Sequence, residues 1–170
     1  LYVTAAFGQI LSQKLLDIPK IGTVNVHPSL LPKYRGPAPV NWSIIEGETR
    51  TGVTTMMTDA GMDTGDILLV RETELSPDED AAMLSERLSR VGAELLVETI
   101  RRIEAGTCPR TPQDSEAASY FPMLTKETGR IDWTRGAQAV VNLVRGVVPW
   151  PGAWTEFGDG ALKIWKASPA

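Results

Sequence analysis

The first half of the chain alternates short apolar runs with helical patterns, and this alternation restricts the possible folds more than any other feature of the sequence. It is typical of an α/β domain, so we expect a largely parallel sheet with helices between its strands. The predicted strands cover residues 1–7 (expected to be buried), 23–27, 53–57 and 67–71, and the predicted helices between them cover residues 12–18 and 40–46.

The strongest helical pattern follows Leu75. Ser76 can cap a helix, Pro77 suits its first turn, and Glu79 completes a Ser-x-x-Glu capping box. Gly106 is expected to end the helix. Between these limits, apolar residues recur near helical spacing at Leu84, Leu88, Val91, Leu95, Ile100 and Ile103. The pattern predicts one long amphipathic helix that packs against the sheet.

A change of composition separates the second half of the chain. Residues 107–119 are rich in Pro, Gln, Asp, Ser and Ala, which is typical of a linker. Beyond them we predict a helix over residues 136–145 and a hairpin of two strands, 153–157 and 161–165. An isolated hairpin is only marginally stable, so this one predicts the opening of a β-rich domain.

We therefore divide the chain into a domain over residues 1–106, a linker over residues 107–128 and the start of a second domain over residues 129–170. The chain opens on an apolar run without an initiator Met and ends on a strand-like run. We expect it to be a piece of a longer polypeptide.

The composition excludes several classes of protein. Hydrophobic residues make up 42% of the chain and charged residues 22%, which is typical of a globular protein. No apolar stretch approaches the roughly 20 residues of a membrane span. The single cysteine, Cys108, excludes an internal disulfide and a cysteine-based zinc site, and it fits a cytoplasmic location. With a net charge of −4, an RNA substrate would have to be bound by a local basic patch or by other segments.

Two polar residues stand at the end of the second predicted strand. Asn25 and His27 are two positions apart, so their side chains lie on one face of the strand. Ligands of open α/β sheets bind at the carboxyl ends of strands, and His27 is the only histidine of the chain. Taken alone, however, these two residues favour a strand end with a surface histidine.

Two unusual loops follow this strand. Residues 28–39 contain four prolines, which reduce the entropy lost when a loop is ordered, as a preformed site requires. Residues 58–66 contain two glycines and three aspartates but lack the Asp-x-Asp-x-Asp spacing of a calcium loop. Considered separately, the first loop is a proline-rich connector and the second a hairpin end with solvated carboxylates.

Together, the two loops carry a family resemblance. Asn-x-His-Pro-Ser-Leu-Leu-Pro-x-Tyr-x-Gly at residues 25–36, followed by Gly-Met-Asp-Thr-Gly-Asp at residues 61–66, resembles the formyltransferases that use 10-formyltetrahydrofolate. The match runs over nearly the whole chain. It implies the C-terminal half of a Rossmann-like formyltransferase core, which is the catalytic domain, followed by the start of a small β-barrel domain.

The same resemblance assigns a site. It implies a catalytic triad of Asn25, His27 and Asp63, with 10-formyltetrahydrofolate as the formyl donor and no metal. Residues 9–11 and 58–63 are expected to form two walls of one folate cleft. The folate-binding residues that the resemblance implies are Gln9, Ile10, Leu11, Ser29, Leu30, Leu31, Pro32, Thr58, Asp59, Ala60, Gly61 and Met62.

The chemistry of formyl transfer suits these three catalytic side chains. An amine that attacks the formyl carbon generates an oxyanion, and Asn25 and a protonated His27 each offer two N–H donors. Asp63 would orient the imidazolium and collect the proton of the amine. Ser29 has no second histidine to activate it, so we expect direct attack without a covalent intermediate.

The acceptor is predicted from the second half of the chain. Residues 130–133, Arg-Ile-Asp-Trp, resemble the branch that acts on initiator methionyl-tRNA, whereas the motif at residues 149–154 is shared with sugar-nucleotide formyltransferases. A sugar-nucleotide acceptor and a formyltetrahydrofolate hydrolase are the alternatives within the superfamily. A non-catalytic folate-binding fragment is the alternative outside enzymes. We expect the isolated fragment to be inactive.

Overall fold

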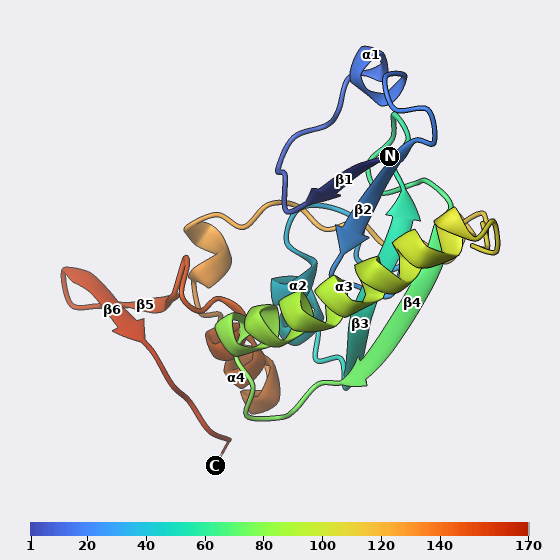
Figure 1. Cartoon of the computed structure of the whole chain (residues 1–170). Helices are drawn as coiled ribbons and strands as arrows, with labels where there is room; N and C mark the ends of the chain where they lie inside the picture. Colours follow the sequence, from blue (N-terminus) through green and yellow to red (C-terminus); the bar gives the residue numbers. More distant parts are fainter. Residues whose placement is uncertain (170) are drawn as a thin grey trace.

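A computed structural model describes residues 1–169 and has a four-stranded mixed sheet at its centre (Figure 1). The strands lie in the order β1 (Tyr2–Ala5), β2 (Thr23–His27), β3 (Arg50–Met57) and β4 (Ile67–Glu74). Within this sheet β1 and β2 pair in parallel, and the other two pairs are antiparallel. The expectation of a largely parallel sheet is therefore wrong. The loop between β3 and β4 contains no crossover helix, so it returns the chain antiparallel.

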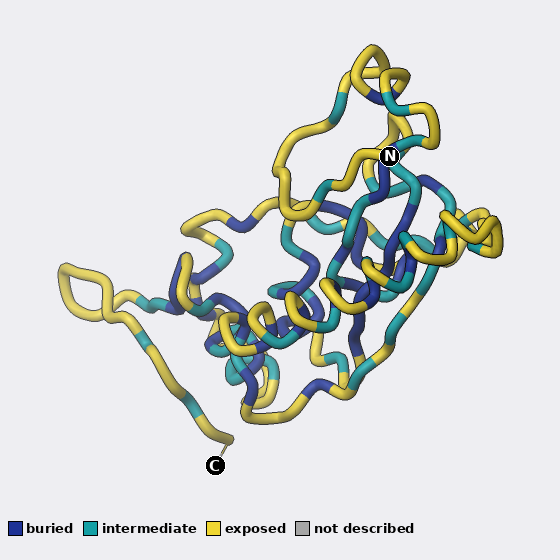
Figure 2. Tube along the Cα trace, viewed as in Figure 1, coloured by how far each residue is buried: buried dark blue, intermediate teal, exposed yellow. Residues whose placement is uncertain are grey.

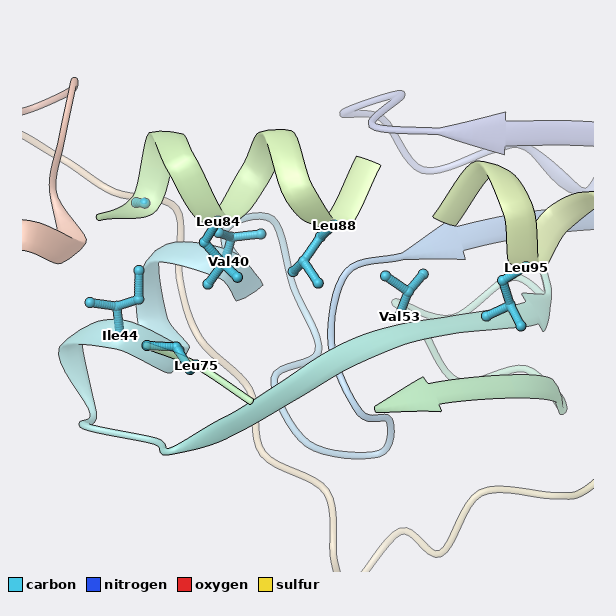
Figure 3. Close-up of a cluster of buried hydrophobic side chains, with 8 residues drawn as sticks. Val40, Ile44, Val53, Leu75, Leu84, Leu88 and Leu95 are labelled. Atoms are coloured by element: carbon cyan, nitrogen blue, oxygen red, sulfur yellow. The ribbon is translucent and has the colours of Figure 1, made fainter. Parts of the chain in front are cut away.

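Helix α3 (Ala81–Glu104) covers one face of this sheet (Figure 1). A buried apolar core lies between them and extends to helix α2 (Pro39–Ile45) (Figure 3); it comprises Val40, Ile44, Val53, Leu75, Ala81, Leu84, Leu88 and Leu95. Gly92 lets α3 approach the sheet closely, because a Cβ atom there would lie 2.9 Å from Val26 Cγ1. The predicted α/β class and the long amphipathic helix are confirmed.

The predicted start of this helix is wrong. α3 begins at Ala81, and its N-cap is Asp80, whose carboxylate accepts a hydrogen bond of 2.9 Å from a backbone N–H in the first turn. The expected capping box of Ser76 and Glu79 does not form, because the Glu79 carboxylate is hydrogen-bonded to the guanidinium of Arg87 instead.

β1 is an exposed edge strand, and the expectation of a buried strand over residues 1–7 is wrong. It pairs on one side, with β2, and most of its trace is exposed (Figure 2). Tyr2 and Val3 are 42% and 43% exposed. The helix that follows, α1 (Gln13–Leu16), is a single turn and is shorter than predicted.

The second half of the chain packs onto the first through α2. Helix α4 (Ala137–Gly146) lies against α2, after the short 3₁₀ helix η1 (Glu127–Gly129), and a second core joins the halves through Ile45, Leu124, Ile131, Val144, Val147 and Ala153. Strands β5 (Ala153–Phe157) and β6 (Gly160–Ile164) form the predicted antiparallel hairpin. The continuation of this hairpin into a β-barrel and the domain boundaries at 106 and 128 stay predictions. In residues 1–169, no helix is both long and apolar enough to cross a membrane.

A partly buried ion pair makes the stability of this fold depend on pH. The Glu79 side chain is 8% exposed, and each of its carboxylate oxygens accepts a hydrogen bond of 2.7 Å from Arg87. These hydrogen bonds hold the pKa of Glu79 below its ordinary value of 4.5, against the opposing effect of burial. A group with a lowered pKa contributes stability above its unfolded-state pKa, and that contribution is lost as the pH falls through the folded-state pKa.

We expect Glu79→Gln to lower the free energy of unfolding by about 1–2 kcal/mol at pH 7, because charge-assisted hydrogen bonds are lost while Arg87 still reaches solvent. The difference should shrink as the pH falls below the ordinary pKa of 4.5 and through the lower folded-state pKa, at which Glu79 becomes protonated in the folded protein. Urea titrations of the natural full-length polypeptide at neutral and acidic pH measure this. Glu86→Gln, which removes an exposed pair with Arg90, is the control, with an expected change below about 0.5 kcal/mol. An equal loss for Glu79→Gln at both pH values would contradict the interpretation.

Candidate active site

His27 is buried at the end of β2, where the loop of residues 28–36 folds over it. It is 4% exposed, and its Nε2 lies 2.9 Å from the carbonyl oxygen of Tyr34. A carbonyl oxygen only accepts hydrogen bonds, so Nε2 carries a proton and donates it to Tyr34. Only the other nitrogen, Nδ1, is therefore left to face a further group. The interpretation of His27 as a surface histidine, which the strand end alone favoured, is therefore wrong.

Asp63 faces this second nitrogen of His27. Its Oδ1 lies 3.6 Å from Nδ1, and its Oδ2 accepts a hydrogen bond of 2.9 Å from the N–H of Gly36. β3 ends opposite Val24, near the start of β2, so the loop of residues 58–66 has to fold back along the sheet to bring Asp63 to His27. The structure therefore brings Asp63 close to His27, as the orienting role expected of its carboxylate requires.

Asn25 lies on the same face of β2 as His27. The hydroxyl of Thr4 on β1 donates to Asn25 Oδ1 at 3.0 Å, which identifies the other end of the amide as the N–H donor. Within residues 1–169, Nδ2 donates to no protein group, so its two N–H bonds are available to a ligand. The catalytic role of Asn25 stays a prediction.

The two residues whose oxygens face the His27 ring nitrogens, Tyr34 and Asp63, have an unusual backbone conformation. Tyr34 has a φ of 61° and Asp63 a φ of 55°, in the left-handed region that residues with a Cβ atom seldom adopt. Such a conformation costs about 1–3 kcal/mol and persists where the surroundings enforce it, typically at functional sites. Here the N–H of Tyr34 donates to Ser119 Oγ at 2.9 Å, and the carboxylate of Asp63 is held by Gly36. Two of the three non-glycine residues with a left-handed φ among residues 1–169 therefore lie at His27.

The electrostatics of Tyr34 keep its side chain out of proton transfer. Its hydroxyl donates to Glu48 Oε1 at 2.8 Å. Burial and the neighbouring Glu48 carboxylate raise the pKa of the Tyr34 phenol well above its usual range, so the hydroxyl stays protonated. In the described part of the chain, no cluster of three or more His, Cys, Asp or Glu side chains could hold a metal ion.

The predicted folate-binding residues fall into three segments. In residues 9–11, Ile10 is 65% exposed, and in residues 58–62, Met62 is 45% exposed. Residues 29–32, in the loop that folds over His27, are buried or half-buried. The cleft expected between the first two segments, and the contacts of all three with folate, stay predictions.

Ser29 is a turn residue. It is fully buried, and its hydroxyl donates to the carbonyl oxygen of Lys33 at 2.8 Å. Its own carbonyl oxygen accepts a hydrogen bond of 2.7 Å from Thr54 Oγ1 on β3. The Ser29 side chain therefore orders the loop that carries the Tyr34 carbonyl.

Two residues outside the two motifs form hydrogen bonds to predicted site residues, and the sequence did not predict them. Thr4 orients Asn25, and Gln113 donates hydrogen bonds to the carbonyl oxygens of Asp63 and Gly65 at 2.9 and 2.8 Å. Gln113 lies in the predicted linker, among residues that are typical of solvent-exposed chain. No pattern in the sequence marks it, because the contact joins positions far apart in the chain.

Two family models match the chain. One, described as formyl transferase, matches residues 1–100, and the other, described as the C-terminal domain of formyl transferase, matches residues 123–170. Similar relatives include the methionyl-tRNA formyltransferases of Geobacter metallireducens, 54% identical, and Citrifermentans bemidjiense, 55% identical, each over 170 residues. These matches cover 100% of this chain and 55% and 54% of the relatives. The chain thus spans about half the length of the curated relatives it matches.

Solved structures share the fold. A sugar N-formyltransferase from Shewanella superimposes with a TM-score of 0.80 over 99% of this chain and 69% of its own, at 21% identity. An N-formyltransferase from Helicobacter canadensis superimposes with a TM-score of 0.79 over 94% of this chain and 58% of its own, at 23% identity. HypX from Aquifex aeolicus, solved with tetrahydrofolic acid, superimposes with a TM-score of 0.78 over 91% of this chain and 27% of its own, at 24% identity. The family match over residues 1–100 takes in more than half of the chain, which therefore belongs to the formyl transferase family.

Proposed function

We propose that the natural full-length protein transfers a formyl group from 10-formyltetrahydrofolate to the amino group of initiator methionyl-tRNA. The observation that carries the proposal is the His27–Asp63 pair beside the available amide donors of Asn25 on one face of the sheet. Relatives at 54% and 55% identity are named methionyl-tRNA formyltransferases, which supports the acceptor. HypX, which has the same fold, was solved with tetrahydrofolic acid, which supports the donor.

The reaction is a direct acyl transfer. The lone pair of the acceptor amine forms the new N–C bond to the formyl carbon, and the C=O electron pair moves onto oxygen. Asn25 Nδ2 stabilises this oxyanion. The bond between the formyl carbon and N10 of folate then breaks as the carbonyl re-forms. One proton leaves the amine and one reaches N10, so the products are the formylated amine and tetrahydrofolate.

Asp63 and His27 handle the proton. Because the Nε2–H of His27 is bound to Tyr34, His27 offers one nitrogen to the site instead of the two donors expected from the sequence. That nitrogen faces Asp63 Oδ1, while Gly36 holds Oδ2. We assign collection of the amine proton to Asp63 and orientation of its carboxylate to His27 and Gly36.

A formyl-transfer assay on the natural full-length polypeptide tests the proposal. Initiator methionyl-tRNA and an amino-sugar nucleotide are each offered with 10-formyltetrahydrofolate, and the formylated product is measured. We expect formylation of the tRNA. Formylation of the sugar nucleotide alone would overturn the acceptor, and release of formate without an acceptor would indicate a hydrolase. Folate binding without transfer or hydrolysis would leave a folate-binding module.

Transfer to a sugar nucleotide is the second candidate function. The net charge of −4 favours a small acceptor over RNA, and solved proteins of this fold include sugar N-formyltransferases. The sequence identities of 54% and 55% to methionyl-tRNA formyltransferases outweigh both observations.

Under the proposal, residues 1–106 belong to the catalytic domain, residues 107–128 connect it to the next domain, and residues 129–170 begin a small β-barrel. The activity belongs in the cytoplasm, where charged initiator tRNA is made and used.

A further inference from the structure

Gln113, in the segment predicted as a linker, makes four hydrogen bonds beside the site. Its Nε2 donates to the carbonyl oxygens of Asp63 and Gly65 at 2.9 and 2.8 Å. Its Oε1 accepts from Arg35 Nε at 3.0 Å and Nη2 at 2.7 Å. Gln113 therefore joins the loop that carries Asp63 to the loop that folds over His27.

Arg35 is a rigid anchor for this contact. It is 3% exposed, and its guanidinium is bound by neutral partners: Gln113, the hydroxyl of Tyr120 at 2.5 Å and the ring of Tyr120, whose centroid lies 5.3 Å away. Its main chain also pairs with Ser119 and Phe121 through hydrogen bonds of 2.9 and 3.0 Å. A buried charge that is held at both its side chain and its main chain has little freedom to move.

We propose that Gln113 is a positioning residue for formyl transfer, and this inference rests on the proposed function. Gln113 binds the main chain of Asp63, which is held in the unfavourable left-handed conformation. This contact fixes the direction of the Asp63 carboxylate, so that Oδ1 faces His27. An amide side chain suits the task, because it donates to two carbonyl oxygens while it accepts from a guanidinium.

Gln113→Glu separates the two halves of this contact. Glutamate has nearly the same shape and accepts from Arg35 more strongly, because it is charged. It has no N–H to offer to the carbonyl oxygens of Asp63 and Gly65. The variant therefore keeps the anchor and loses the positioning bonds, whereas Gln113→Met loses both. Glu116→Gln, an exposed position in the same segment, is the matched control.

The predicted folate-binding stretch is held independently of Gln113. The carboxylate of Asp59 accepts hydrogen bonds from Gly61 N at 3.0 Å and from Thr64 Oγ1 at 2.7 and 2.8 Å. These bonds close the turn of residues 59–64 on itself. Loss of the Gln113 contact should therefore change turnover much more than folate affinity.

In the natural full-length polypeptide, we expect Gln113→Glu to lower kcat about 10–100-fold, since misplacing a catalytic group by about 1 Å can cost about 10²-fold. The affinity for tetrahydrofolate, measured by titration, should change less than about threefold, whereas a general loss of structure would lower both. In the Asp63→Asn background, Gln113→Glu should add less than about a twofold loss, because it acts through Asp63. Glu116→Gln should leave kcat unchanged.

A normal kcat in Gln113→Glu, a full additional loss in the double variant, or a parallel loss of folate affinity would each overturn the proposal. Amide hydrogen exchange gives a measurement that needs no acceptor. The N–H of Gly36, which binds Asp63 Oδ2, should exchange faster in Gln113→Glu and Gln113→Met than in Glu116→Gln, and unchanged exchange would also overturn the proposal. If the unsubstituted protein transfers no formyl group, the proposed function fails, and the exchange rates still decide the positioning role.

Discussion

Asn25→Ala is expected to lower the kcat of the full-length protein about 10²–10³-fold, the usual scale for the loss of one oxyanion donor. Within residues 1–169 the Nδ2 group has no protein acceptor, so its removal costs little in the folded protein and much when the oxyanion forms. Folate affinity should persist, because the predicted folate contacts come from other segments. Steady-state kinetics and a tetrahydrofolate titration measure the two quantities.

Thr4→Val is the matched control for this variant. It leaves the Asn25 amide in place but removes the hydroxyl that binds its Oδ1, so the amide is less well oriented. We expect a loss of about 3–10-fold in kcat, the equivalent of one ordinary hydrogen bond. A normal kcat in Asn25→Ala would remove Asn25 from the catalytic groups, whatever the result for Thr4→Val.

Asp63→Asn should have an effect at least as large, about 10²–10⁴-fold in kcat, the range for a general acid or base. Asparagine keeps the shape and still accepts from Gly36, but it has no negative charge with which to collect a proton. The dependence of kcat on pH should therefore differ between the variant and the unsubstituted protein. Asp66→Asn, at the other end of the same loop, is the control and should lose less than about threefold.

The partnership of Asp63 with His27 predicts that their effects do not add. Once Asp63→Asn is present, His27→Ala should cost much less than it costs alone, because both residues serve the same proton transfer. Near-normal turnover in Asp63→Asn, or strictly additive losses in the double variant, would contradict the assigned roles.

Elements with a strong local pattern were predictable. β2 begins and ends where its alternation of apolar and polar residues indicated, and its apolar residues Val24 and Val26 are buried and packed against the core, respectively. The start of α3 was not predictable in the same way. Ser76 and Asp80 can both cap a helix, and the choice depends on Glu79, whose partner Arg87 lies on the finished helix.

The site shows the same division. The two motifs identified His27 and Asp63 as a pair, and the structure brings them within 3.6 Å. The hydrogen bond from His27 Nε2 to the Tyr34 carbonyl oxygen could not be predicted from the sequence. It depends on the left-handed conformation of Tyr34, which directs that carbonyl at the ring. Gln113 was equally hidden, since a glutamine in a polar, proline-containing stretch has no local feature that distinguishes it from solvated chain.

The contact of Gln113 with Asp63 also has a consequence for how the protein folds as it leaves the ribosome. The two residues are 50 positions apart in the chain, and synthesis adds about 5–20 residues per second, so roughly 3–10 s separate their emergence. During this interval β1 to β4 can already pair, and the first turns of α3 can pack on them. The Asp63 loop, however, still lacks the side chain that holds it, and Arg35 still lacks its acceptor. The last residue of the core beneath α3, Leu95, precedes Gln113 by 18 positions, so that core can form only about 1–4 s before the Asp63 loop is ordered.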